Sequence, residues 1–206
     1  QHPTRITAGS ECRAYALSHC SFKEALLLDA QTMPALNPEY LFATTEFRAR
    51  GAVLWPDAPP RQIQPQAWHL CGLQPRQESP IATAPMLVDK EKCWAALALW
   101  LWCDENSDVY HPHTRGGTDT AHLTFRKAGV PFAVPSRVHQ QGRSHYDLTG
   151  KLVFQQRKQN SWSLFFPRQD VPASRFEKEC RTYLEELQRA WMSQSRQRDV
   201  FSPLLG

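Results

Sequence analysis

Asp29 is the first candidate for chemistry in this sequence because of its position. It directly follows the apolar run Ala25–Leu28, and a polar, proline-broken segment comes after it. The run is uncharged and too close to Pro34 for a helix of ordinary length, so it predicts a short strand buried on both faces. Ligands collect at the carboxyl ends of such strands in open α/β sheets. We therefore expect Asp29 in a ligand pocket; the alternative is an Asp that caps its own loop.

The elements that would position Asp29 alternate between strand and helix, which predicts an α/β fold. The Pro- and Gln-rich region 58–85 predicts an irregular layer without long regular elements. Further strands are expected at Gly51–Asp57, Met86–Val88, Val130–Val134 and Leu152–Phe154. Helices are expected from Ser10 towards Cys20, from an N-cap at Asp89 through Trp94–Cys103, over Thr118–Ala128, and from the capping box Ser174–Glu177 to Trp191.

Composition predicts one globular core with a helical extension. The chain has 206 residues, of which 41% are hydrophobic, enough for one sizeable core. We expect a domain over residues 1–170 and a helix over 171–206 that packs on it. The net charge of +4 comes from scattered basic residues, which argues against a nucleic-acid partner. The longest apolar run, Trp94–Cys103, is about half the length of a membrane span, so no span is expected.

Cysteine and histidine residues give weaker signals. The six cysteines form no CxxC pair and have no zinc-ligand spacing. Cys93 and Cys103 lie in the apolar helix and predict buried thiols. If the domain is secreted, Cys12 with Cys20 or Cys71 would be the first candidates for a disulfide. A final group could suggest a metal site, although surface histidines are the better interpretation: His111, His113, His139 and His145.

Several short motifs occur in a shared order: Asp29-Ala-Gln31, Asn37-Pro-Glu-Tyr-Leu-Phe42 and Gly51-Ala-Val-Leu-Trp-Pro-Asp57. They resemble the fungal mannan-type α-mannosyltransferases, which have the GT-A glycosyltransferase fold. That family carries a strand ending in Asp-Ala-Asp, an Asn-Pro or Asp-Pro turn before Tyr-Leu-Phe, and Gly-Ala-Leu-Phe-Trp-Pro-Asp. The resemblance covers roughly residues 15–157, with further matches at Val88–Lys90 followed by Trp94, at Asn106–Tyr110, at Asp119–Thr120 and at Gly129–Pro131.

The resemblance implies a GT-A-like mixed sheet flanked by helices, and a hexosyltransferase. It implies transfer of mannose from a nucleotide sugar, GDP-mannose first, to a glycan hydroxyl. Asp29 would contact the donor ribose or a weakly held Mn2+ or Mg2+ ion. The resemblance also implies the secretory pathway or Golgi lumen as the location. The donor-site residues expected on this basis are Asp29, Gln31, Trp55, Gln156 and Arg157.

Departures from the family pattern weaken the metal site. Gln31 stands where the family has the second Asp of Asp-x-Asp, and Gln156 stands where Phe-x-His-Arg has its His. Gln31 is a poorer ligand for these cations than the Asp it replaces, and Gln156 replaces a second presumed ligand. Ala82–Pro85 stands where the family has Glu-Ser-Gly-Gln. We expect either metal-free chemistry, with Arg157 or Lys158 offsetting phosphate charge, or a domain that has stopped catalysing.

Asp119 is the candidate catalytic residue. It corresponds to an Asp of the family's Gly-Asp-Lys-Asp-Thr and follows two glycines at a predicted helix start. Its carboxylate could face the reacting sugar, or it could be an N-terminal cap whose charge the helix dipole stabilises. Trp55, at a strand end, is the aromatic residue that we expect to contact a saccharide.

The short N-terminal part suggests an incomplete site. Only residues 1–28 precede Asp29, whereas one βαβ unit takes about 30 residues or more. The nucleobase-binding half is therefore expected to be shortened, missing or supplied by a partner chain. Two alternatives to an active transferase stay open: a catalytically degenerate domain that binds glycans or proteins, and a fragment of a larger transferase.

Overall fold

The computed structural model describes residues 11–57, 59–136, 144–156 and 176–201. The chain divides into two compact units, 1–156 and 157–206, and each is described by itself. The predicted boundary near residue 170 stays a prediction. The described helices are α1 (Glu11–His19), η1 (Pro38–Ala43), α2 (Thr45–Arg50), α3 (Pro65–Leu70), α4 (Lys90–Glu105), α5 (Ser107–Tyr110), η2 (His111–His113), α6 (Gly117–Lys127) and α7 (Glu177–Phe201).

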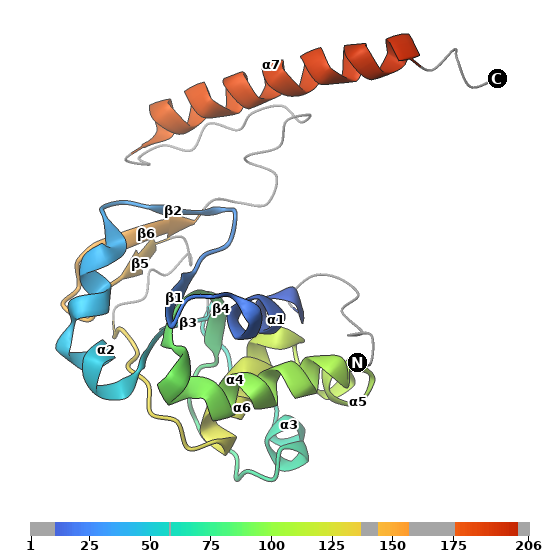
Figure 1. The fold of residues 1–206 in the computed structure, drawn as a ribbon. Helices are drawn as coiled ribbons and strands as arrows, with labels where there is room; N and C mark the ends of the chain where they lie inside the picture. Colours follow the sequence, from blue (N-terminus) through green and yellow to red (C-terminus); the bar gives the residue numbers. More distant parts are fainter. Residues whose placement is uncertain (1–10, 58, 137–143, 157–175, 202–206) are drawn as a thin grey trace. The chain divides into compact units, whose positions relative to one another are not determined.

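Two small antiparallel sheets form the centre of the first unit (Figure 1). The first has the order β1–β4–β3, with β1 at Glu24–Leu27, β4 at Ile81–Asp89 and β3 at Ala52–Pro56. The second has the order β2–β6–β5, with β2 at Thr32–Pro34, β6 at Leu152–Gln156 and β5 at Ser144–Tyr146. The mixed α/β composition is confirmed. Two antiparallel sheets stand where we expected one mixed sheet.

Strand β4 is buried on both faces. Its side chains alternate between the two faces of the sheet, and each face packs against a different hydrophobic cluster. Met86 and Val88 join the cluster that includes α4 and α6, whereas Leu87 joins the cluster that includes the second sheet. This explains the uninterrupted apolar stretch of the sequence at this point. The helices α1, α4 and α6 contribute to the larger cluster, which includes Leu54, Met86, Leu97, Trp100 and Phe125.

The region 58–85 is more regular than its composition predicts. Helix α3 lies within it, and β4 begins at Ile81 rather than at Met86. Pro85 is tolerated because the β3–β4 register is irregular here: Leu54 pairs with Met86, but Pro56 pairs with Ile81. Proline is compatible with a strand where the ladder is already interrupted.

The expected strand at Val130–Val134 is reduced to a single parallel bridge between Val53 and Ala133. Leu54 N donates to Ala133 O at 2.9 Å, and Ala133 N donates to Ala52 O at 2.9 Å. The helix predicted before it is confirmed as α6. Gly129, with φ of 67°, adopts the left-handed conformation that follows helix ends.

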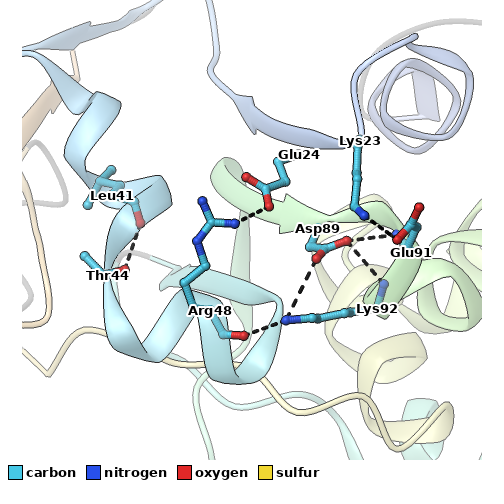
Figure 2. A network of polar contacts seen from close by, with 8 residues as sticks. All are labelled: Lys23, Glu24, Leu41, Thr44, Arg48, Asp89, Glu91 and Lys92. Carbon is cyan, nitrogen blue, oxygen red and sulfur yellow. Dashed lines mark hydrogen bonds and ion pairs between the residues drawn. The ribbon is translucent and has the colours of Figure 1, made fainter.

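The predicted N-cap of α4 is confirmed and belongs to a wider polar network (Figure 2). Asp89 Oδ1 accepts from the backbone N–H groups of Glu91 and Lys92 at 3.1 and 3.4 Å. Lys92 Nζ donates to Arg48 O at 2.5 Å, and Arg48 pairs with Glu24 at 2.5 Å. The network therefore joins the start of α4 to α2 and to β1.

Two of the three tryptophans of α4 are exposed to solvent. Trp100 is fully buried, but Trp94 is 53% exposed and Trp102 is 48% exposed. The sequence 94–103 is apolar on every side of the helix, so periodicity could not identify the solvent face. Cys93 and Cys103 are buried, as predicted, and burial raises the pKa of each thiol to about 12. All six cysteines are free thiols in the structure.

Helix α7 runs from Glu177 to Phe201 in the second unit. Ser174 of the predicted capping box lies outside the described residues, and the packing of this helix on the domain stays a prediction. Across the part of the chain that the structure describes, none of the helices combines the length and apolarity that a membrane span requires.

Candidate functional site

Asp29 follows β1 at its carboxyl end, as the sequence predicts, and α1 holds its side chain in place. Arg13 Nη2 lies 2.5 Å from Asp29 Oδ1, and Arg13 Nη1 donates to Thr83 Oγ1 of β4 at 2.6 Å. Thr32 N donates to Asp29 O at 2.8 Å, which closes the turn into β2. The Asp29 side chain remains 25% exposed. Its carboxylate is therefore oriented by Arg13 and still accessible to a ligand.

Strand pairing brings the two glutamines of the predicted donor site to one end of the second sheet. Thr32 of β2 lies opposite Gln156 of β6. Gln31 directly precedes Thr32, in the turn between β1 and β2. Asp29 and Gln31 therefore lie between β1 and β2, and Gln156 at the end of β6 lies beside the start of β2. Arg157 follows Gln156 but lies outside the described residues.

His145 is a further member of this site, and it is not on the surface as we expected. It lies on β5 opposite Phe154 of β6 and is only 7% exposed. Burial lowers the pKa of His145, although its hydrogen bond with Gln156 and the charge of Asp29 both act to raise it. Its Nε2 atom is buried and has no hydrogen-bond partner. A buried imidazole whose pKa is lowered by burial therefore lies beside Gln156.

The other predicted histidines lie elsewhere. His111 contacts Asp104 at 3.4 Å, His113 is exposed, and His139 lies outside the described residues. Nothing local distinguishes His145 in the sequence. Only the pairing of β5 with β6 identifies it, which is a contact that single-sequence periodicity does not reveal.

The side chains gathered at Asp29 do not fit a divalent cation held in the way that the resemblance implies. Asp29 is the one carboxylate among them, and it is already paired with Arg13. Gln31, Gln156 and His145 add amides and an imidazole, whereas Mn2+ and Mg2+ favour carboxylate oxygens. Within the described ranges there is no group of three or more His, Cys, Asp or Glu side chains that could hold a metal ion.

Asp119 lies apart from these contacts, in a buried ion-pair cluster. Its side chain is 4% exposed, and its Oδ1 lies 2.5 Å from Arg61 Nη2. Arg61 also pairs with Asp57 at 3.0 Å, and Asp119 Oδ2 accepts from Arg115 N at 2.9 Å. These contacts fix the loop before α6 and favour the structural interpretation of Asp119 over a carboxylate that faces a sugar.

Trp55 is part of the core. It is 1% exposed, its Nε1 donates to Tyr146 O at 2.7 Å, and its ring packs edge-on against Phe154. The structure therefore presents no open face of this ring to a saccharide. Trp55 instead connects β3 to β5 and β6 of the second sheet through Tyr146 and Phe154.

We expect the domain to lose stability in mild acid, because His122 and His145 are buried. Burial lowers the pKa values of His122 and His145, so the unfolded chain binds more protons than the folded one as the pH falls through about 6.5. Unfolding free energy should therefore decrease from pH 8 to pH 5.5. Melting temperatures across this range would measure it. The slope should weaken in His122→Gln and remain in the exposed control His69→Gln; equal slopes in all three proteins would contradict the prediction.

Comparisons with known proteins agree with these motifs. Residues 1–120 match the family described as "Mannosyltransferase putative". Among curated proteins of Candida albicans, the chain is 35% identical over 65 residues to the α-1,2-mannosyltransferase MNN21, which is 32% of this chain and 10% of that protein. It is 33% identical over 67 residues to MNN24 (32% and 9%) and 37% identical over 60 residues to MNN22 (29% and 10%). The matches span about a tenth of these relatives.

Proposed function

The chain belongs to this mannosyltransferase family, and from that membership we propose that it forms the donor site of a GT-A-like transferase. The transferase moves mannose from GDP-mannose to a hydroxyl of a glycan in the secretory pathway. One observation carries the proposal. The carboxylate at the end of β1 is held in place by α1, and the pairing of β6 with β2 and β5 brings the amide of Gln156 and the imidazole of His145 near it.

The side chains divide the work of binding the donor. Asp29, oriented by Arg13, accepts hydrogen bonds from the ribose hydroxyls. The amides of Gln31 and Gln156 donate to the phosphate oxygens. His145 orients the Gln156 amide through the hydrogen bond between them. Catalysis then consists of stabilising the departing diphosphate with preorganised donors.

Basic side chains, rather than a metal ion, supply the positive charge that offsets the negative charge of the diphosphate. Arg157 and Lys158 follow Gln156 directly in the sequence and are the residues we assign to this task. We assign structural roles to Asp119 and Trp55, because both are buried and both have structural partners.

A second candidate function is a degenerate domain that binds glycans or proteins without catalysis. The pairing of Asp29 with Arg13 and the poor fit to a divalent cation favour it. A fragment that another part of a longer transferase completes is compatible with the same observations, because the matches cover only a tenth of the relatives.

The donor site predicts that GDP-mannose stabilises the folded chain without manganese. A ligand that binds only the folded state at 100 times its Kd stabilises it by about 2.7 kcal/mol. Melting temperatures with GDP, UDP and GDP-mannose, each with and without manganese, would measure this. Asp29→Asn should remove most of the shift. The exposed control Asp108→Asn should keep it.

Gln31→Asp separates the two candidate functions. If the original protein responds to no nucleotide but Gln31→Asp gains a manganese-dependent shift, the domain is a lapsed transferase and the second candidate is correct. A shift that Asp29→Asn leaves intact would place the nucleotide elsewhere and overturn the proposed site.

A further inference from the structure

A pocket of about 470 Å³ lies at the start of β1, at the opposite end of this strand from Asp29. Its volume is within the range of small-molecule sites. The start of α4 forms its other side. It is lined by Ser21, Phe22, Lys23, Lys90, Glu91 and Trp94.

Two aromatic side chains of this pocket are open to solvent. Phe22 is 67% exposed and Trp94 is 53% exposed. On α4 the neighbouring residues Cys93, Ala96 and Leu97 are buried, so Trp94 is on the outward side of the helix. Large aromatic rings contribute substantial apolar area when they are covered, and they favour ligands that present C–H groups to the ring face.

The polar part of the lining is arranged around an ion pair. Lys23 Nζ lies 2.5 Å from Glu91 Oε2, and the two side chains are 59% and 70% exposed. Figure 2 shows this pair at the start of α4. The Lys90 side chain is held in place by two hydrogen bonds: its Nζ donates to Cys20 O at 2.5 Å and to Ser18 O at 3.4 Å. Lys23 and Glu91 can therefore donate to and accept from hydroxyl groups without leaving their positions.

The chemistry of this lining matches a sugar better than a protein partner. A pyranose has an apolar C–H face and a rim of hydroxyls, and the pocket offers aromatic rings beside a charged pair. Among the described residues that line it there is no Leu, Ile, Val, Ala or Met, whereas an apolar helix face would require such contacts. We propose that this pocket, which we call the Phe22–Trp94 pocket, binds a hexose unit of a glycan. The inference rests on the proposed function, since a mannan-type acceptor is the expected polymer.

The position of the Phe22–Trp94 pocket separates it from the donor site. The four-residue strand β1 lies between them and spans roughly 13 Å at about 3.3 Å per residue. One hexose cannot contact both sites, but one polymer can. The pocket would hold a remote unit of the acceptor and thereby raise the local concentration of its reacting end.

Binding of soluble α-mannan to the purified chain, measured by affinity electrophoresis and calorimetry, tests this inference. Phe22→Ala and Trp94→Ala should each weaken mannan binding at least tenfold. Trp102→Ala is the matched control, because Trp102 is 48% exposed on the same helix and does not line the pocket. It should leave binding unchanged. All three variants should keep their fold and their melting shift with GDP-mannose.

The outcomes distinguish the pocket from the donor site. Mannan binding that Phe22→Ala and Trp94→Ala leave unchanged would overturn the inference, as would a protein that responds to GDP-mannose but does not bind mannan. In the latter case the proposed donor site would stand. Pocket-dependent mannan binding without any nucleotide response would support the inference and favour the glycan-binding module over the transferase.

Discussion

Replacing Arg61 by methionine is expected to lower the free energy of unfolding by about 3 kcal/mol. Arg61 is the cation that neutralises Asp119, whose side chain is 4% exposed, and it also pairs with Asp57. Methionine keeps much of the length of the side chain but removes the charge. A buried carboxylate is then left uncompensated, which is far more costly than the loss of an exposed ion pair. Arg115 N remains as a donor to Asp119 but supplies no full charge.

Urea unfolding of the original and variant proteins would measure the loss. Arg76→Met is the matched control, because Arg76 is exposed, and it should change stability by less than about 0.5 kcal/mol. Adding Asp119→Asn to Arg61→Met should recover part of the loss, because the orphaned charge is removed. Additive losses in this double variant would show that the pair is not coupled and would contradict the interpretation.

The elements that the sequence predicts correctly carry their own local signals. Asp29 at a strand end follows from an apolar run stopped by a polar segment. The N-cap at Asp89 follows from a short acidic residue before an apolar helix, and α6 follows from the glycines that bound it. Each of these signals lies within a few residues of the element that it predicts.

The features that the sequence did not predict depend on distant partners. Pro85 could be placed in β4 only with knowledge of the irregular pairing to β3, and His145 only with the pairing of β5 and β6. Arg61 and Asp119 meet across a long sequence separation. The exposure of Trp94 depends on which side of a uniformly apolar helix faces the sheet. These are tertiary choices, which local propensity does not decide.

Gly51→Ala is the second substitution with a large expected effect, and we expect it to cost at least about 2 kcal/mol. Gly51 ends α2 with φ of 79°, a conformation that L-residues rarely adopt. Its N–H donates to Phe47 O at 2.7 Å. A Cβ atom here would lie 2.7 Å from Lys92 Cβ, which cannot move without shifting the start of α4.

Gly150→Ala provides the matched control for the backbone contribution. Gly150 has φ of 86°, but a Cβ atom at that position would meet nothing within 4 Å. Gly150→Ala should therefore cost only the conformational strain, about 1 kcal/mol, and the excess in Gly51→Ala reports the contact with Lys92. If Gly51→Ala and Gly150→Ala lower the unfolding free energy equally in urea, the start of α4 can shift to accommodate the new Cβ atom without a measurable cost. A clear excess would mean that the close approach of α2 to α4 is rigid. The start of α4, which carries Glu91 and Trp94, would then be held in a fixed position relative to the sheet.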